Sequence, residues 1–337
     1  MPFRDVIGHR RIVALLARSV ARQSLPPSLI FGGPSGVGKR LTALGVAQAL
    51  NCSTARSTDE LEIDACGACA PCTRIARGVH PDVLLVEPGD TGSIKIDPVR
   101  EVIDRAAYRP FEGKRRAVII DEADALVPQA QNALLKTLEE PPPASVFMLV
   151  TARPDVLLPT IRSRCPRLSF QPLKADDIAA ALVALGHSER DARAVAATAD
   201  GSLGHALEAS AGGLIEARAI AQRVLARAAA AGDPGTRIET AKDLLAKTGA
   251  GAAGDREQLA SHLRAMGSLL RDIELLSTRA DARALANPDV QPALERLTDA
   301  YRGERGMRAF TAVDQALAAL DRNAGAKIVA DWLVLQL

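Results

Sequence analysis

The sequence predicts an α/β domain built on a parallel sheet in its first half and helical segments in its second half. Five short runs rich in valine, isoleucine, leucine and phenylalanine alternate with helical patterns between residues 28 and 170, which is typical of a parallel sheet with crossover helices. From about residue 212 onwards only helical periodicity is present. Because 337 residues are too many for one small core, we expect two or three domains.

The composition excludes several classes of protein. Apolar residues make up 47% of the chain and charged residues 24%, which is typical of a globular protein and not of a disordered one. The N-terminus has no apolar run that could be a signal peptide, and no segment has the roughly 18 uninterrupted apolar residues of a membrane span. We therefore expect a cytoplasmic protein without membrane contacts. The formal net charge of +2 leaves any nucleic-acid contact to local basic clusters.

The strands and helices of the first half are predicted one by one. The five apolar runs are residues 28–33, 83–88, 116–121, 146–152 and 167–170. Helical patterns begin at Gly38, Pro98 and Pro128, and three consecutive prolines at 141–143 end the last of these helices. Residues 174–210 predict three short helices, because glycines interrupt the pattern at 186–187 and at 200–202.

The second half predicts longer helices that pack on one another. Glycine-rich stretches at 231–235 and 249–255 are expected to break these helices. Apolar residues recur at helical spacing in three stripes, which we expect to be packed faces of a helical bundle. The stripes are Leu259, Leu263, Met266, Leu270, Ile273 and Leu276; Phe310, Val313, Leu317 and Leu320; and Ile328, Trp332 and Leu335.

The stretch GGPSGVGKR, residues 32–40, has the pattern of a phosphate-binding loop between a strand and a helix. The loop glycines are Gly33, Gly36 and Gly38. They would let backbone N–H groups turn toward phosphates, the following helix would add its positive dipole, and Lys39 would reach the terminal phosphates. A coincidental glycine-rich turn is the alternative, and the strand before it and the helix after it argue against that alternative.

One residue of this loop departs from the pattern. A hydroxyl that ligates Mg²⁺ should follow Lys39, and the chain has Arg40 instead. A guanidinium carries donors only, so it cannot ligate a metal ion. Thr42 is two residues further along the helix and faces away, since two residues turn by roughly 200°. We therefore do not expect efficient Mg²⁺-dependent hydrolysis, whereas ATP or ADP binding stays open because Arg40 can still pair with a phosphate.

Acidic residues supply the second half of a nucleotide site. Asp121 and Glu122 follow the apolar run at 117–120. In such a site Asp121 would hold the metal's water shell and Glu122 would polarise the attacking water. Two solvated acids at a strand end are the simpler explanation, but the phosphate loop nearby makes a nucleotide-site origin the better one. The acids indicate ancestry and do not establish activity.

Four of the five cysteines lie in one insertion with the spacing of a metal site. They are Cys52, Cys66, Cys69 and Cys72. Two consecutive C-x-x-C steps bring thiolates together, and Cys52 supplies the fourth sulfur of a tetrahedral zinc site. Because disulfides are disfavoured in the cytoplasm, a structural Zn²⁺ is the expected occupant. An iron–sulfur cluster and unliganded thiols remain as alternatives.

Four further stretches carry a resemblance to a known family. The segments IKIDPVREVIDRA, GKRRAVIIDEADAL, NALLKTLEEPP and LLPTIRSRC resemble, in this order, the clamp-loader branch of the AAA+ ATPases. The four-cysteine insertion is similar to that of bacterial members. The resemblance is strong over residues 1 to about 210. It implies a RecA-like AAA+ domain over 1–172 with a zinc module at 51–77, a helical lid over 173–211, and a helical collar over 212–337 that joins five subunits in a ring.

The resemblance also implies roles for single residues. The motif Ser163, Arg164 and Cys165 matches the family's Ser-Arg-Cys motif, whose arginine enters the ATP site of the neighbouring subunit. A planar guanidinium, always charged, suits the charge that develops on the γ-phosphate. Without the resemblance, Arg164 would be taken for a surface salt-bridge residue, and Cys165 is expected to be a buried, small apolar side chain.

Two more positions are compared with the family's motor subunits. Thr151 stands at the position of their first sensor. Their lid carries a sensor arginine after Gly-Ser-x, and here that position is Gly204. His205 is a poor substitute because it is mostly neutral at pH 7. Arg40 and Gly204 thus remove two parts of the chain's own ATP site, while Arg164, which would serve another site, is kept.

This pattern implies a non-motor, stator-like component of the DNA polymerase III holoenzyme, without appreciable ATP turnover of its own. The implied partners are the tau/gamma motor subunits and the delta subunit of a hetero-pentameric ring, the sliding clamp and, through the complex, primed DNA. Three alternatives remain: a tau/gamma-type motor, another AAA+ replication or recombination ATPase, and a zinc-stabilised DNA-binding module. The scarcity of aromatic residues, 3% of the chain, argues against the last.

Overall fold

The chain forms two compact units. The computed structural model describes residues 1–58, 60–89, 91–208, 213–230, 233–245, 251–278, 285–322 and 324–337. Unit 1 comprises Met1–Asp177 and Gly201–Gly204, and unit 2 comprises Ile178–Asp200 and His205–Leu337. The lid expected at 173–211 is divided between these units, so its standing as a separate domain stays a prediction, as do the outer bounds given to the other domains.

Unit 1 is built on a five-stranded parallel sheet in the order β2-β3-β4-β1-β5. The strands are β1 (Ser28–Gly32), β2 (Val83–Val86), β3 (Arg116–Ile120), β4 (Ser145–Thr151) and β5 (Arg167–Ser169). Every predicted apolar run forms a strand, because β1, β3 and β4 are buried on both faces and such strands are continuously apolar. The predicted fold class, a parallel RecA-like α/β domain followed by helical segments, is confirmed.

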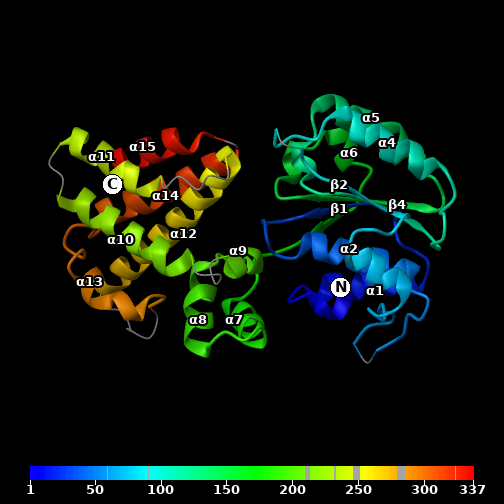
Figure 1. Ribbon diagram of the computed structural model, residues 1–337, viewed down its shortest axis with the longest axis horizontal. Coiled ribbons are helices and arrows are strands. Elements are labelled where there is room, and N and C mark those ends of the chain that lie inside the picture. Colours follow the sequence, from blue (N-terminus) through cyan, green and yellow to red (C-terminus); the bar gives the residue numbers. More distant parts are fainter. Residues whose placement is uncertain are drawn as a thin grey trace. The chain divides into compact units, whose positions relative to one another are not determined.

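Helices cover both faces of the sheet. The helices of this unit are α1 (Arg10–Ala21), α2 (Lys39–Asn51), α3 (Ala70–Ala76), α4 (Ile96–Ala107), α5 (Pro128–Glu139) and α6 (Pro159–Arg162). α1 and α2 lie on one side of the sheet, and α4 and α5 lie on the other (Figure 1). Side chains alternate along a strand, so Phe31 packs with residues of α1 and α2 while Ile30 packs with residues of α4 and α5. The helix predicted from Pro98 begins two residues earlier, since proline is accepted anywhere in a first turn.

The parallel sheet has two chemically distinct edges. All strands begin at one edge, here called the amino edge, and end at the other, the carboxyl edge. The phosphate loop after β1, Asp121 after β3 and Thr151 at the end of β4 lie at the carboxyl edge. Asp82 before β2 and Cys165 before β5 lie at the amino edge. Ligands of open α/β sheets bind at the carboxyl edge, so the two edges are expected to differ in function.

Unit 2 is helical. Its helices are most of α7 (Ala175–Ala184), then α8 (Glu189–Thr198), most of α9 (Leu203–Glu208), α10 (Leu214–Ala230), α11 (Pro234–Leu244), α12 (Gly251–Ser277), α13 (Gln291–Glu295), α14 (Glu304–Asp321) and α15 (Ala326–Gln336). The three short helices predicted for 174–210 are present as α7, α8 and α9. Buried side chains of α10 to α15 form one core, in which the hydroxyl of Tyr301 donates to the carbonyl of Leu225 at 2.9 Å.

Two predictions for the helical half are wrong in part. The break expected at 249–255 is helical from Gly251 onward, because α12 begins there, and residues 249–250 lie outside the described residues. The stripe on α15 does not pack in the core: Ile328 is 74% exposed, and Trp332 and Leu335 are also exposed. α15 is apolar on several sides, and its buried side is formed by Val329, Ala330, Leu333 and Val334. Phe310 of α14 is likewise 40% exposed, while the other predicted stripe residues are buried or half-buried.

Among the residues that the structure describes, no helix combines the length and the apolar character needed to cross a membrane.

Candidate functional site

The phosphate loop keeps the backbone geometry that its sequence predicts. Gly36 has φ 69°, a left-handed conformation that favours glycine, and a Cβ atom there would lie 2.1 Å from Ser202 Oγ. The loop leads directly into α2, whose first N–H groups have no acceptor within the helix. His9 braces the loop from outside, since its Nε2 lies 3.0 Å from the carbonyl oxygen of Val37. The main-chain cradle of an anion site is therefore present.

Lys39 lies inside this cradle. Its Nζ donates to the carbonyl oxygens of Gly33 and Pro34, at 2.7 and 2.5 Å. Burial lowers the pKa of Lys39 to about 8, although the nearby carboxylates of Asp121, Asp124 and Glu122 oppose this shift. The ammonium group thus remains mostly protonated at pH 7 and is hydrogen-bonded to its own loop.

Arg40 occupies the place where a metal ligand was expected, and it pairs with acids from two neighbouring strands. Its Nη1 donates to Glu87 Oε1, just after β2, and to Asp121 Oδ2, just after β3, the latter at 3.2 Å. The guanidinium is thus held against the acid that would otherwise serve a metal ion. Glu87 was missed by the sequence analysis because it lies 47 residues from Arg40 and belongs to no motif.

The remaining acids and the sensor threonine form a second group at the carboxyl edge. The hydroxyl of Thr151 donates to Asp124 Oδ1 at 2.7 Å, and Arg153 Nε donates to Asp124 Oδ2 at 2.9 Å. Burial raises the pKa of Glu122, and the neighbouring Asp121 and Asp124 raise it further. Glu122 has φ 47°, a left-handed conformation that is uncommon for a residue other than glycine. The structure therefore brings the predicted residues 33–40, 121–122 and 151 to one edge of the sheet.

Gly204 packs directly on the phosphate loop. Its N–H donates to the carbonyl oxygen of Gly36 at 2.9 Å, and a Cβ atom at position 204 would lie 3.0 Å from Gly36 Cα. A side chain at this position requires the loop or the start of α9 to move. Position 204 therefore has no arginine, and its backbone packs so closely on Gly36 that a side chain there would disturb the loop or α9.

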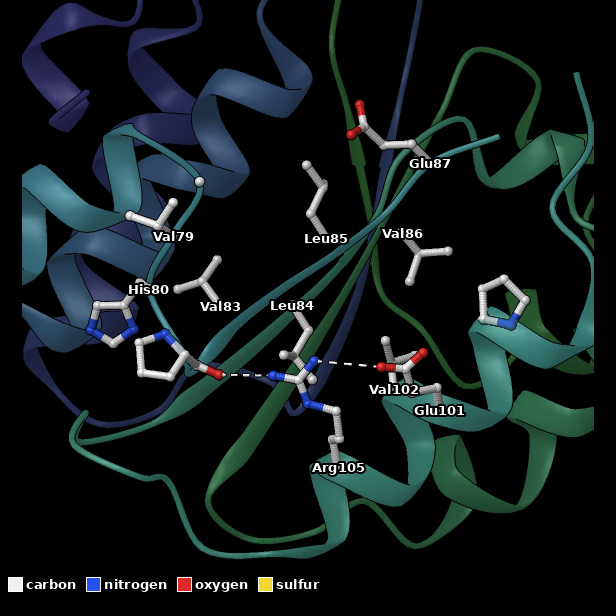
Figure 2. Close-up of a pocket in the computed structure, with 13 residues that line it drawn as sticks. Val79, His80, Val83, Leu84, Leu85, Val86, Glu87, Glu101, Val102 and Arg105 are labelled. Atoms are coloured by element: carbon white, nitrogen blue, oxygen red, sulfur yellow. Dashed lines mark hydrogen bonds and ion pairs between the residues drawn. The ribbon is translucent and has the colours of Figure 1, made fainter. Parts of the chain in front are cut away.

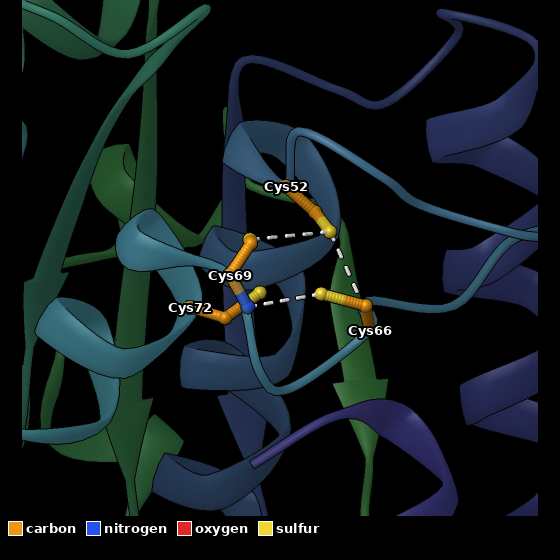
Figure 3. Close-up of side chains that lie close together, drawn as sticks. All are labelled: Cys52, Cys66, Cys69 and Cys72. Atoms are coloured by element: carbon orange, nitrogen blue, oxygen red, sulfur yellow. Dashed lines mark hydrogen bonds between the residues drawn. The ribbon is translucent and has the colours of Figure 1, made fainter.

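The four clustered cysteines converge as their spacing predicts (Figure 3). The Sγ atoms of Cys52, Cys66, Cys69 and Cys72 all lie within 4.8 Å of one another, and Cys52 Sγ is 3.8 Å from Cys69 Sγ. Four thiolates at about 2.3 Å from a tetrahedral Zn²⁺ lie roughly 3.8 Å apart, so these side chains fit a zinc ion. The four cysteines could therefore hold zinc as a closed structural site.

The charge balance within the cluster also fits a cation. The Thr54 side chain and the N–H groups of Ala68 and Cys69 lower the pKa of Cys66 to about 5. Burial raises the pKa of Cys72, and the adjacent sulfurs of Cys69 and Cys52 raise it further. Several thiolates at such short distances repel one another unless a cation lies between them.

Hydrogen bonds from three sides hold the cysteine module in place. Gln48 Nε2 of α2 donates to the carbonyl oxygen of Cys72 at 2.8 Å, and Lys114 Nζ donates to that of Cys52 at 3.1 Å. Arg4 Nη1 donates to the buried Asp64 at 2.9 Å and Arg4 Nη2 to the carbonyl oxygen of Cys66, also at 2.9 Å. The module is thereby joined to α2, to the segment before β3 and to the N-terminal residues.

The amino edge contains a buried ion pair between Asp82 and Arg116 that no sequence motif indicated. Asp82 is fully buried and accepts N–H bonds from Phe111, Glu112 and Gly113 at 2.7 to 2.9 Å. Arg116 Nη2 donates to the same carboxylate at 2.9 Å. Burial alone would raise the pKa of Asp82, but these donors outweigh it and hold the pKa at about 2. Asp82 thus joins the starts of β2 and β3.

Arg164 lies at the amino edge, immediately before β5. Its carbonyl oxygen accepts from Ser28 Oγ, at the start of β1, at 3.4 Å. Its side chain is 35% exposed and pairs with Glu139 at the end of α5, with Nη2 2.5 Å from Oε1. Cys165 is buried in the core between the sheet, α4 and α5, as expected, and burial raises its pKa. Ser163 caps its own turn by donating to the Thr160 carbonyl.

A groove with a cavity volume of about 460 Å³ runs along β2, the outermost strand on its side of the sheet, beside α4 (Figure 2). Arg105 closes part of it by donating to the Pro81 carbonyl at 3.3 Å and pairing with Glu101 at 3.8 Å. Of the residues that line the groove, only Glu87 also contacts the phosphate-loop site. Among these residues, the groove and that site therefore meet only at Glu87.

Comparisons with known proteins found similarity to subunits of DNA polymerase III, and the family match lies within unit 1. Residues 8–174 match the family described as DNA polymerase III, delta subunit. Over 211 residues the chain is 33% identical to DNA polymerase III subunit tau of Salmonella typhimurium, covering 61% of this chain and 32% of that protein. The tau subunit of Bacillus subtilis is 32% identical over 211 residues, covering 61% of this chain and 36% of that protein. The chain thus spans about a third of the length of these relatives.

Solved structures of similar size are more distant. A DNA polymerase III gamma subunit-related protein from Thermotoga maritima is 19% identical with a TM-score of 0.42, covering 95% of this chain and 96% of that one. The similarity to DNA polymerase III subunit tau covers 61% of this chain, and the family match lies within unit 1.

Proposed function

We propose that this chain is the delta-prime-type stator of a bacterial DNA polymerase III clamp loader, a subunit that supplies Arg164 to the ATP site of a neighbouring motor subunit. In this role it does not hydrolyse ATP appreciably. It closes a ring with tau/gamma motors and a delta subunit, and the ring loads the sliding clamp onto primed DNA. The zinc module stabilises the fold, and unit 2 supplies the collar.

The position of Arg164 carries this proposal. Its backbone is bonded to Ser28 at the first residue of β1, whereas the chain's own phosphate loop follows the last. Five residues of strand separate these positions by roughly 16 Å. A side chain at the amino edge therefore serves a site other than the one at its own carboxyl edge. An arginine finger supplied from another protein raises hydrolysis by about 10³ to 10⁵.

The state of the chain's own site supports the same role. Arg40 replaces the metal-ligating hydroxyl and pairs with Asp121, and Gly204 replaces the sensor arginine and packs on Gly36. The retained Lys39, Asp121, Glu122 and Thr151 favour the alternative, a tau/gamma-type motor. The two roles make different demands on the sheet. A stator needs Arg164 at its amino edge for the loader's ATP hydrolysis, whereas a motor needs its own phosphate loop at the carboxyl edge.

Site-specific hydrolysis in a reconstituted loader tests the proposal. The adjoining motor should be the only subunit with an intact phosphate loop, so that other sites do not mask its rate. We expect Arg164→Ala to reduce clamp- and DNA-stimulated hydrolysis by about 10³ or more. The matched control Arg162→Ala removes a nearby exposed arginine that pairs with Asp155, and it should leave the rate unchanged. Equal rates for the two variants would refute the assignment of Arg164.

A further inference from the structure

The carboxyl edge has a charge arrangement that does not fit the divalent cation expected of this fold. Mg²⁺ requires an octahedral shell of oxygen ligands, and such sites use one or two carboxylates together with phosphate oxygens and water. Asp121 is the candidate carboxylate, and its two oxygens are already engaged: Oδ2 accepts from Arg40 and Oδ1 accepts from the Glu122 N–H at 3.0 Å. No hydroxyl stands next to Lys39 to complete the shell.

A metal ion here would also lie beside a permanent positive charge. The Arg40 guanidinium is fixed between Glu87 and Asp121, whose side chains are 48% and 15% exposed. Guanidinium cannot lose its proton in a protein, so the repulsion of a divalent ion does not disappear at any ordinary pH. The two acids that would attract a metal ion are the partners that hold Arg40 in place.

The guanidinium retains donors for a second ligand. Both carboxylates are bonded through Nη1 alone. Nε and Nη2 therefore have no partner among the residues that the structure describes, and the side chain is 44% exposed. Arginine presents its donors as a planar fork that matches two oxygens of a phosphate group. Arg40 is the second residue of α2, next to the loop whose main-chain N–H groups and Lys39 form the anion cradle.

We propose that Arg40 is a built-in cation that takes the place of the divalent metal ion, so that this loop binds the phosphates of a nucleoside di- or triphosphate without a metal ion. Glu87 and Asp121 hold the guanidinium in position, as they would hold the water shell of a metal. This role concerns the chain's own phosphate loop and does not depend on the role proposed for Arg164. It separates nucleotide binding, which is kept, from metal-assisted hydrolysis, which is lost.

The test measures binding of a fluorescent ADP analogue to the full chain, by anisotropy, in Mg²⁺ and in EDTA. The wild type should bind at least as tightly in EDTA as in Mg²⁺. Arg40→Thr restores the hydroxyl of the usual pattern, so its binding in EDTA should be at least about tenfold weaker than in Mg²⁺. Arg100→Thr, which removes an exposed arginine of α4, should behave as the wild type. Lys39→Ala should weaken binding in both media.

A second readout follows the metal ion itself. With ADP present, the wild type should leave the electron paramagnetic resonance signal of free Mn²⁺ no lower than in the same Mn²⁺–ADP solution without protein, whereas Arg40→Thr should lower it. Three results would overturn the proposal: wild-type binding that requires Mg²⁺, no wild-type binding in either medium, or binding by Arg40→Thr that is as independent of metal as that of the wild type. Thermal unfolding of each variant verifies that it is folded.

Discussion

The two edges of the sheet in unit 1 use their charged residues in opposite ways. At the carboxyl edge Lys39 bonds to its own loop and Arg40 pairs with Asp121, so both cations lie at the chain's own phosphate loop. At the amino edge Arg164 pairs with Glu139 and donates to the Thr160 carbonyl oxygen at 2.9 Å. The edge where this fold normally performs chemistry therefore has an arginine next to Lys39, while the opposite edge has an arginine that does not contact the phosphate loop.

The two edges also differ in the contacts that stabilise them. α2 runs from the phosphate loop back to the amino edge, where Cys52 follows its last residue. The cysteine module and the buried pair of Asp82 with Arg116 therefore brace the amino edge. At the carboxyl edge, the hydrogen bond from the Gly204 N–H to the Gly36 carbonyl oxygen stabilises the phosphate loop. In the proposed role, the contacts at the amino edge would stabilise the edge that carries Arg164.

Metal removal should have the largest effect on the amino edge. We expect about one zinc ion per chain by elemental analysis, and its loss from Cys69→Ser. If zinc stabilises the folded chain as a ligand at a thousand times its Kd, removal costs at least about 4 kcal/mol. Urea unfolding with and without a strong chelator measures this. Cys165→Ala, which changes the cysteine outside the cluster, should keep the metal; a metal-free wild type with unchanged stability would contradict the structural role of the site.

Breaking the buried ion pair should have the next largest effect. Asp82→Asn leaves Arg116 buried without its counter-charge and should cost about 3 kcal/mol of unfolding free energy at neutral pH. The exposed Asp104→Asn should cost nothing measurable.

The same pair gives a pH dependence of defined sign. The pKa of Asp82 is held at about 2, below its ordinary value of 3.8, so its stabilisation is present above about pH 4 and is lost as the pH falls toward 2. The wild type should therefore lose more stability across this window than Asp82→Asn does. Parallel pH profiles of the two proteins in urea unfolding would contradict this account.

A smaller effect is expected at the carboxyl edge. Gly204→Arg introduces a side chain that forces atoms against Gly36, and such overpacking costs about 1 to 3 kcal/mol. Thermal unfolding measures the loss. Gly213→Arg is the matched control, because a Cβ atom at position 213 meets open space. If Gly204→Arg is as stable as the control, the packing of Gly204 on the loop does not fasten this edge.

Sequence patterns predicted the features that depend on residues close together in the chain or on a recurring motif. The strands followed from continuous apolar runs, because a parallel sheet is buried on both faces. The cysteine cluster followed from C-x-x-C spacing, and the carboxyl-edge grouping of Lys39 with Asp121 followed from the order of motifs. In each case the residues that meet are close in sequence or belong to a recurring pattern.

Contacts between distant segments could not be predicted in this way. Neither the pairing of Arg40 with Glu87 nor the packing of Gly204 on Gly36 has a signal in spacing or composition. On α15, several sides are apolar, so periodicity could not show that Ile328 and Trp332 face outward while Leu333 is buried. Tertiary packing, and not the sequence of the helix alone, determines which side of α15 is buried.

The most direct test of the contrast between the edges compares Lys39→Ala with Arg164→Ala in one reconstituted loader. Clamp- and DNA-stimulated ATP hydrolysis should stay within about twofold of the wild type for Lys39→Ala, because in the proposed role the chain's own loop does not hydrolyse ATP. It should fall sharply for Arg164→Ala, by about 10³ at the site that the arginine completes. If Lys39→Ala costs as much as Arg164→Ala, the carboxyl edge is an active ATPase site and this chain is a motor.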